Sequence, residues 1–365
     1  MRKILFGGSF DPVHNGHLAI AKKAREALKA DKVVFLIAKY PRWKEVGTPF
    51  FHRLEMLKIA LEGISWAEIS LVEYQSDQKI NYTCDTVEKI VSSSSDEYFF
   101  LIGSDQLQQL DRWKRIDELA DKVRFVAIRR PGYPLHEENR EKYRVEIIDE
   151  CVDAISSSAI RDFTSLNCPK RVIDYIGKND LYYIPKIRSY LSARRFNHSL
   201  SVADLAYAIA KQNDLDAGKA YIAGLLHDIG KEIPGEEQKE FMKRNYPLYE
   251  KTIPTVLYHQ FLSEEIAKKE FRIDDAEILE AIRYHATGNR NMNPYARIVY
   301  ASDKIEPTRG YDSGELIEAM KSDYALGFVR VLEENIRFLQ SKNSSYSNPL
   351  TRDCISEYLK RGESK

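Results

Sequence analysis

The sequence lacks long apolar stretches, closely spaced cysteines and an excess of charge of either sign. No apolar run approaches the ~18 residues of a membrane span, and the first residues read as the start of a strand instead of a signal peptide. The 4 cysteines include no Cys-x-x-Cys pair, which argues against a disulfide framework or a zinc ribbon and favours a reducing cytoplasm. The 55 basic and 55 acidic residues cancel, whereas dedicated nucleic-acid binders carry a basic excess. We therefore expect a cytoplasmic protein whose partners are small molecules, not nucleic acid or a membrane.

The chain is long enough for two domains, and its first half has the pattern of a layered α/β fold. It has 365 residues, against ~100–200 in a typical domain, and 43% of them are hydrophobic. Short apolar runs alternate with helical periodicity, which predicts a parallel, doubly wound sheet with right-handed crossovers. Strands are expected at Lys3–Phe6, Lys32–Ala38, Ala67–Val72, Tyr98–Ile102 and Val123–Ile128, with Val145–Ile148 as a further candidate. Helices are expected at Asn15–Lys29, Phe51–Leu61 and Cys84–Val91.

The second half shows helical periodicity and almost no strand signal. From about Pro185 onward, we expect helices at Ser199–Gln212, Ala217–Ile229, Tyr258–Glu270, Asp275–Ala286, Ala296–Ile305 and Gly314–Ser341. The predicted fold class is therefore α/β plus all-α. A Rossmann-like domain over residues 1–184 is followed by an all-helical domain over residues 185–365.

A glycine-rich segment with two histidines follows the first predicted strand and opens a helix. It reads Gly7-Gly8-Ser9-Phe10-Asp11-Pro12-Val13-His14-Asn15-Gly16-His17. Open α/β sheets bind ligands at the carboxyl ends of their strands, where a helix N-terminus offers free N–H groups to a phosphate. His14 and His17 are three residues apart and share one helix face. Their rings can therefore donate hydrogen bonds to a phosphoryl oxygen.

A second segment, Ile155–Arg161, reads Ile-Ser-Ser-Ser-Ala-Ile-Arg and offers hydroxyls, helix N–H groups and an arginine to a phosphate. The two segments resemble the His-x-Gly-His and Ile-Ser-Ser-Thr-x-Ile-Arg signatures of the nucleotidylyltransferase superfamily, with Ser158 in place of threonine. The resemblance implies nucleotidyl transfer with His14 and His17 as catalytic residues. It implies contacts with ATP and its phosphates from Gly7, Gly8, Ser9, Phe10, Ser156, Ser157 and Arg161.

Phosphopantetheine adenylyltransferases share both signatures, but further segments are similar to those of nicotinate mononucleotide adenylyltransferases. These segments are His52–Leu57, Asn81–Thr86, Gly103–Asp105 with Trp113–Lys114, and Arg129–Tyr133. The resemblance implies in-line attack of the mononucleotide phosphate on the α-phosphorus of ATP, assisted by Mg²⁺. The residues implied to hold the mononucleotide are Lys44, which is also a catalytic candidate, Tyr82, Thr83, Asp105, Trp113 and Arg130.

Two positions on the mononucleotide side depart from that family. Trp43 stands where the family has histidine, and Asn81 stands where it has serine. Nicotinamide mononucleotide therefore stays open as an alternative substrate to nicotinate mononucleotide.

The helical half contains four histidines and two aspartates of the types that bind transition metals. They are His198, His227, Asp228, His259, His285 and Asp303. Helix-borne imidazoles and carboxylates that converge in a bundle core can hold two metal ions such as Fe, Mn or Zn. The His227-Asp228 pair follows an apolar helix, where a buried charge without a partner is costly. A carboxylate such as Asp228 can bridge two cations, which lower the pKa of a shared water.

This set resembles the HD phosphohydrolase superfamily and, more closely, its bacterial symmetrical bis(5′-nucleosyl)-tetraphosphatases. The segments Arg195–Ser199, Tyr284–Gly288 and Ser302–Arg309 carry the resemblance. It implies that the six residues ligate two transition-metal ions, Fe or Mn, with Asp228 also catalytic. It further implies hydrolysis of diadenosine tetraphosphate to two ADP, with Arg195, Lys231 and Arg309 as candidate phosphate contacts.

Together the two halves predict a bifunctional enzyme whose substrates are ATP, nicotinate mononucleotide and diadenosine tetraphosphate. Two alternatives stay open for the helical half. It could act on other nucleotides as a phosphatase or phosphodiesterase, or it could be a regulatory module without turnover. Assembly into a homo-oligomer also stays open.

Overall fold

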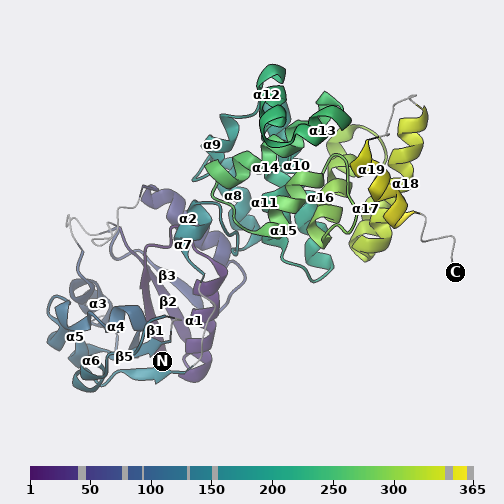
Figure 1. Cartoon of the computed structure of the whole chain (residues 1–365). Coiled ribbons are helices and arrows are strands. Elements are labelled where there is room, and N and C mark those ends of the chain that lie inside the picture. Colours follow the sequence, from purple (N-terminus) through teal and green to yellow (C-terminus); the bar gives the residue numbers. More distant parts are fainter. Residues whose placement is uncertain are drawn as a thin grey trace. The chain divides into compact units, whose positions relative to one another are not determined.

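The computed structural model describes residues 1–39, 47–75, 81–92, 94–129, 132–149, 155–341 and 348–359, and these fold as two compact units (Figure 1). The first unit comprises Met1–Arg161 and Asn167–Leu181, and the second unit comprises Asp162–Leu166 and Tyr182–Lys365. The short segment Asp162–Leu166 thus belongs with the helical residues that follow it in the chain. The domain boundary between residues 184 and 185 stays a prediction.

The first unit is built on a six-stranded parallel sheet with the strand order β3-β2-β1-β4-β5-β6. The chain runs from β1 outward to β3, returns to place β4 beside β1, and then runs to the opposite edge. Right-handed crossovers put the helices of the two halves on opposite faces, so the predicted doubly wound fold is confirmed. The strands are β1 (Arg2–Gly8), β2 (Lys32–Ile37), β3 (Ala67–Ser70), β4 (Glu97–Gly103), β5 (Arg124–Ile128) and β6 (Glu146–Ile148).

The central strands are apolar almost throughout, because helices cover both faces of the sheet. Five of the six residues of β2 are buried, as are five of the seven residues of β4. The register pairs Gly8 with Ile37 and Phe6 with Leu101, so the carboxyl ends of β1, β2 and β4 meet at one edge of the sheet. The strand order reverses between β1 and β4, and open sheets of this type bind ligands at that point.

The helices of the first unit flank the sheet (Figure 1). They are α1 (Asn15–Ala27), α2 (Phe50–Leu61), α3 (Thr83–Val91), α4 (Ser104–Leu107), α5 (Ile116–Lys122), α6 (Glu137–Lys142), α7 (Ser157–Arg161) and α8 (Lys170–Lys178). Helix α1 is the next element after β1, joined to it by a six-residue loop, and its first turn therefore lies at the edge of the sheet where the strand order reverses.

The second unit is helical, and its described residues contain no strand, so the all-α prediction is confirmed. Its α-helices are α9 (Ile184–Arg188), α10 (Ala193–Gln212), α11 (Ala217–Leu226), α12 (Gly235–Asn245), α13 (Pro247–Thr252), α14 (His259–Glu270), α15 (Ala276–Tyr284), α16 (Pro294–Ile305), α17 (Gly314–Ser322), α18 (Tyr324–Ser341) and α19 (Pro349–Tyr358). Helices α10 and α11 pack closely, because a Cβ at Gly224 would lie 2.8 Å from the Cα of Ala203. Within the described ranges, no helix is long and apolar enough to cross a membrane.

The single helix predicted over Gly314–Ser341 is wrong, since the structure has two helices, α17 and α18, that are separated at Asp323. Asp323 has extended backbone dihedrals. Its carboxylate accepts hydrogen bonds from the N–H groups of Ala325 (2.8 Å) and Leu326 (3.0 Å) and so caps α18. The sequence also fails to predict α12 and α13. Within these fully described helices, Met242 of α12 is the one buried residue, which leaves no apolar stripe to detect.

Candidate functional site

The loop after β1 carries two histidines that cap helix α1 reciprocally. His14 Nδ1 accepts a hydrogen bond from the His17 N–H (3.3 Å), and His17 Nδ1 accepts one from the His14 N–H (3.2 Å). The two rings stack with their centroids 3.7 Å apart. Gly16 makes room for this stack, because a Cβ there would lie 3.0 Å from His14 Nδ1. Local folding thus places both predicted catalytic histidines at one helix N-terminus.

These contacts fix the tautomer of both rings. A ring nitrogen that accepts a hydrogen bond carries no proton in neutral histidine, so the proton of His14 and of His17 lies on Nε2. Each ring therefore presents an N–H donor. An anionic oxygen at the start of α1 would meet these donors together with the positive end of the helix dipole.

The predicted second phosphate motif contacts the loop of the first. The Ser157 hydroxyl donates to the carbonyl oxygen of Pro12 (2.9 Å), 145 residues earlier in the chain. The Arg161 guanidinium donates to the carbonyl oxygen of Asp11 (2.5 Å). Ser156 accepts a hydrogen bond from the Ala159 N–H (3.1 Å) and so supports the first turn of α7. The structure therefore brings the two predicted phosphate segments together.

The remaining predicted phosphate contacts lie at the end of β1. Gly7 and Gly8 are the last residues of that strand, and Ser9 and Phe10 follow it. The Phe10 ring is 1% exposed and packs edge-on against the His17 ring, with centroids 5.1 Å apart. Phe10 thus contributes to the position of the histidine pair from within the core.

Arg53, to which sequence reasoning assigned no role, braces this loop. Its side chain is 1% exposed and lies on α2. The guanidinium donates hydrogen bonds to four main-chain carbonyl oxygens, those of Ser9 (2.8 Å), Ala38 (2.8 Å), Lys39 (3.2 Å) and Thr48 (3.2 Å). It therefore ties the loop after β1 to the chain that leaves β2. The sequence carries no signal for this role, because the acceptors are backbone atoms that any residue would supply.

The residues predicted to hold the mononucleotide are distributed over two helix starts. Tyr82 lies immediately before α3, and Thr83 is the first residue of that helix. Asp105 lies in α4, directly after β4. Lys44 and Arg130 fall outside the residues that the structure describes.

Trp113 links this region to the core of the first unit. Its ring packs edge-on against Phe100 (5.8 Å between centroids) and Phe125 (6.2 Å). The neighbouring Lys114 ammonium lies 3.7 Å from the centroid of the Tyr82 ring. The structure thus brings the Trp113–Lys114 segment beside Tyr82.

Three histidines of the second unit repeat one local hydrogen-bond pattern. In each, Nδ1 faces the main-chain oxygen of the residue three positions earlier. The pairs are His227 with Gly224 (2.7 Å), His259 with Val256 (3.0 Å) and His285 with Ile282 (2.7 Å). His227 and His285 directly follow α11 and α15, where helix carbonyls lack a partner within the helix. Nδ1 therefore carries the proton, and Nε2 of each ring has an available lone pair.

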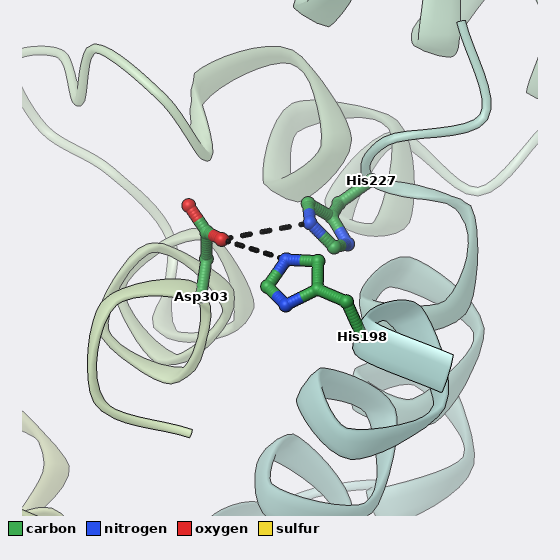
Figure 2. A group of neighbouring side chains, drawn as sticks. All are labelled: His198, His227 and Asp303. Carbon is green, nitrogen blue, oxygen red and sulfur yellow. Dashed lines mark hydrogen bonds and ion pairs between the residues drawn. The ribbon is translucent and has the colours of Figure 1, made fainter. Parts of the chain in front are cut away.

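His198, His227 and Asp303 point toward one another from α10, the end of α11 and α16 (Figure 2). Asp303 Oδ1 lies 3.2 Å from His198 Nε2 and 3.7 Å from His227 Nε2. Two ligands that each lie about 2.1 Å from one cation are separated by about 3–3.6 Å. The first of these distances lies in that range and the second just above it, and the ligand atoms of all three side chains lie within 4.8 Å of one another, so small shifts would let them share one ion.

Asp228 connects these residues to the other two histidines. Its Oδ2 lies 3.6 Å from His227 Nε2, whereas its Oδ1 lies 3.2 Å from His259 Nε2 and 3.4 Å from His285 Nε2. All six predicted ligands thus meet in one cluster. The two oxygens of Asp228 face different histidines, which is the geometry of a carboxylate that can bridge two cations.

Burial and neighbouring charges set the protonation of the cluster. Complete burial lowers the pKa of His227 to about 4, and burial also lowers the pKa values of His259 and His285. Burial by itself raises the pKa of each aspartate. However, His227 next to Asp228, and Lys304 next to Asp303, outweigh burial and hold both pKa values well below the usual range. Burial by itself lowers the pKa of His198, but Asp303 and Glu306 beside the ring outweigh burial and raise it. Neutral imidazoles and ionised carboxylates are the forms that bind divalent cations, so His227, His259 and His285 are the histidines that burial keeps in the ligand form.

Two features of these residues fit resident metal ions. His227 Nε2 is buried and has no hydrogen-bond partner among the described residues, and an unsatisfied buried polar atom costs about 1–3 kcal/mol. His259 Nε2 and His285 Nε2 face each other at 3.1 Å, although both are acceptors. Divalent cations would satisfy all three lone pairs, and imidazole and carboxylate ligands suit Fe, Mn or Zn.

The three predicted phosphate-binding cations of this unit lie around the cluster. Arg195 contacts Asp228 Oδ2 (2.7 Å), and Arg309 contacts Asp303 Oδ1 (2.5 Å). Lys231 Nζ lies 3.2 Å from both ring nitrogens of His259, and its ammonium can donate to the Nε2 lone pair. Their positive charges therefore border the ligand cluster on the sides of both aspartates.

Sequence reasoning assigned no role to Lys304 and Glu306, which the structure places beside the ligands. Lys304 donates to the carbonyl oxygen of His285 (2.9 Å), and Glu306 Oε1 lies 3.0 Å from His198 Nδ1. Both lie within the segment Ser302–Arg309, but their contacts bridge distant parts of the chain. Only the three-dimensional structure reveals them.

Known protein families match both units. The cytidylyltransferase-like family model matches residues 5–163, and the HD domain model matches residues 195–308. A Mycoplasma genitalium protein named probable nicotinate-nucleotide adenylyltransferase/Ap4A hydrolase is 32% identical over 354 residues, which cover 90% of this chain and 96% of the relative.

Two further relatives each match about half of the chain. A Streptococcus pneumoniae protein named probable nicotinate-nucleotide adenylyltransferase is 38% identical over 187 residues, or 49% of this chain and 87% of that protein. A solved structure from Clostridium acetobutylicum, titled a predicted HD superfamily hydrolase involved in NAD metabolism, is 32% identical. It covers 48% of this chain and 97% of its own chain, with a TM-score of 0.45.

Proposed function

The chain belongs to the family of two-domain proteins named nicotinate-nucleotide adenylyltransferase/Ap4A hydrolase, and we propose that it carries both activities. In this proposal, the first unit transfers the adenylyl group of ATP to nicotinate mononucleotide and releases pyrophosphate. The second unit hydrolyses diadenosine tetraphosphate (Ap4A) symmetrically to two ADP.

The paired Nε2–H donors of His14 and His17 support adenylyl transfer most strongly. In the reaction, an oxygen of the mononucleotide phosphate forms a bond to the α-phosphorus of ATP, and the bond from that phosphorus to the leaving pyrophosphate oxygen breaks. Negative charge grows on the phosphoryl oxygens, where preorganised donors stabilise the transition state. Mg²⁺ bound with ATP would neutralise further phosphate charge.

Ser157 and Arg161 would serve this reaction in two ways. Their hydrogen bonds to Pro12 and Asp11 hold the loop before α1 in place. The Arg161 side chain is also 34% exposed, so its outer donors remain accessible to a phosphate. The Tyr82 ring and the Trp113 segment would bind the pyridine ring of the mononucleotide.

The inward-facing Nε2 atoms of four histidines, arranged around Asp228 and Asp303, carry the proposal for the second unit. When bound there, two divalent ions would supply Lewis acidity and a nucleophile from water near neutral pH. Arg195, Lys231 and Arg309 would hold the polyphosphate through charge-assisted hydrogen bonds. Water adds to a phosphorus beside the central bridging oxygen, the bond to that oxygen breaks, and a proton passes to the leaving ADP.

Product analysis tests the hydrolase directly. The full chain is loaded with Mn²⁺ or Fe²⁺, incubated with Ap4A, and compared with a His227→Ala variant. ADP as the sole product, absent with the variant, supports symmetrical cleavage at this cluster. ATP together with AMP would contradict symmetrical cleavage. Turnover of other nucleotides but not of Ap4A would favour a phosphatase of different specificity, and binding without turnover would favour a regulatory module.

A competition assay tests the transferase substrate. The chain is incubated with ATP, Mg²⁺ and equal concentrations of nicotinate and nicotinamide mononucleotide. The proposal predicts that deamido-NAD forms faster than NAD. The opposite preference would assign nicotinamide mononucleotide as the substrate.

A further inference from the structure

Glu306 is a fully buried carboxylate that lies behind the ligand cluster. It is 1% exposed and accepts hydrogen bonds on both oxygens. The donors are the Ser201 hydroxyl (2.6 Å), the Thr308 N–H (2.7 Å), the Thr308 hydroxyl (2.7 Å) and His198 Nδ1 (3.0 Å). These four hydrogen bonds hold the carboxylate in one orientation.

Within the described residues, no lysine or arginine forms an ion pair with Glu306, and His198 is its one titratable partner in the salt bridges. The carboxylate therefore directs its charge at the His198 ring. A histidine whose Nδ1–H donates to a carboxylate keeps its Nε2 lone pair oriented and becomes a stronger ligand. His198 Nε2 is the atom that faces Asp303 Oδ1 at 3.2 Å.

Glu306 also supports Asp303, the candidate ligand that faces His198. It precedes the short helix η3 (Pro307–Arg309) and caps it through the Thr308 N–H. Arg309 at the end of η3 contacts Asp303 twice, through the main-chain oxygen (2.5 Å) and through Oδ1 (2.5 Å). One buried carboxylate thus restrains the environment of both His198 and Asp303.

The other half of the cluster is oriented by different groups. His259 and His285 each donate from Nδ1 to a main-chain oxygen, and no carboxylate accepts from either Nδ1 among the described residues. We propose that Glu306 is a positioning residue that holds the His198–Asp303 half of the cluster in ligand geometry, and that the Asp228–His259–His285 half does not depend on it. This inference rests on the metal centre proposed above.

The test is a Mn²⁺ titration of the full chain without nucleotide, in which electron paramagnetic resonance measures free and bound Mn²⁺. The wild type is expected to bind two ions. In Glu306→Gln, the amide has one acceptor oxygen in place of two, and its NH₂ group must face another donor. The variant is expected to bind one ion with unchanged affinity and the second about 10–100-fold more weakly, the usual range for loss of such a partner.

Two further variants make the test decisive. Ser201→Ala removes one donor to Glu306 and should weaken the same single ion severalfold, which decides the question if Glu306→Gln does not fold. Asp275→Asn changes a carboxylate that contacts no histidine and should leave both ions unchanged.

Two results would overturn the inference: a folded Glu306→Gln that binds both ions like the wild type, or one that weakens both equally. A wild type that binds no Mn²⁺ would contradict the metal centre itself, so the two failures are distinguishable.

Discussion

His259 Nε2 and His285 Nε2 lie 3.1 Å apart in the interior of the second unit, and both nitrogens are acceptors. Their Nδ1 atoms face the main-chain oxygens of Val256 and Ile282, which fixes the protons on the outer sides of the rings. Asp228 Oδ1 approaches the same point from 3.2 and 3.4 Å. Three acceptor atoms thus face one position, with the Lys231 ammonium 3.2 Å from one of them, His259 Nε2. A divalent cation at this position would be ligated by all three acceptors.

Metal removal should therefore destabilise the second unit and not the first. At an ion concentration about 100 times Kd, binding stabilises the native state by about 2.7 kcal/mol. For a unit of this size, that corresponds to a fall of roughly 5–10 °C in Tm on chelation. Calorimetry of the full chain with and without chelator measures it, and Asp303→Asn should show a smaller fall. Equal shifts in both transitions, or no shift at all, would refute the metal centre.

His14→Asn should impair adenylyl transfer through the lost Nε2–H donor. Asparagine is also a good cap, so helix α1 should persist. Removal of one preorganised donor typically lowers kcat about 10²–10³-fold. The assay is steady-state formation of deamido-NAD, with KM measured separately.

The chain offers a matched control for this variant. His136 Nδ1 also caps a helix, by accepting from the Asn139 N–H (3.2 Å), but it lies outside the candidate site. His136→Asn should retain wild-type kcat. Similar losses in both variants would show that the effect comes from capping alone.

The sequence predicted the strands of the first unit well, because buried parallel strands are continuously apolar. The sequence-based prediction failed for helices whose apolar residues show little periodicity. Helix α13 has no buried residue, and the break between α17 and α18 depends on one capping aspartate, Asp323. A cap differs from an exposed helix residue only through contacts that form on folding.

The six candidate ligands could be predicted from the sequence because histidine and aspartate each carry metal-binding chemistry of their own, and the structure brings them together. The positioning residues could not be predicted. Glu306 contacts His198, which lies 108 residues earlier in the chain, and Arg53 contacts the Ser9 carbonyl oxygen, 44 residues earlier. These roles depend on which distant residues the tertiary fold brings together. The presence of a glutamate or an arginine in the sequence does not identify its partner.

Arg53→Lys should destabilise the first unit, because a single ammonium cannot reach four carbonyl oxygens. Each buried carbonyl oxygen left without a donor costs about 1–3 kcal/mol. We expect a lower Tm for the first unit and slower adenylyl transfer, with Mn²⁺ binding by the second unit retained. Arg171→Lys, at an exposed ion pair with Glu62, is the control and should change neither. Unchanged adenylyl transfer by Arg53→Lys would exclude a role for Arg53 in holding the loop after β1 in place.

Asp275 provides a test of pH dependence away from the cluster. It caps α15 and pairs with Lys219 Nζ (2.8 Å). Burial by itself raises the pKa of its carboxyl, but the hydrogen bonds from Lys219 and from the helix N–H groups lower it below the usual value. A folded pKa below the unfolded one gives stability that is present above about pH 4 and is lost as the pH falls through the folded pKa.

Asp275→Asn keeps the cap and removes the charge. At pH 7 it should be less stable than the wild type by about 0.5–1 kcal/mol, and the difference should shrink as the pH falls below about 4. Thermal unfolding of both proteins across this range measures it. A difference that stays constant with pH would show that the ion pair contributes nothing.

Crossed variants test whether one chain holds two independent active centres. Adenylyl transfer and Ap4A hydrolysis are measured in separate reactions for the wild type, His14→Asn and Asp303→Asn. We predict that His14→Asn loses deamido-NAD formation and keeps hydrolysis, whereas Asp303→Asn loses hydrolysis and keeps transfer, with ADP as the sole product of Ap4A. Loss of both activities in either folded variant, or ATP and AMP as the products of Ap4A, would contradict the account.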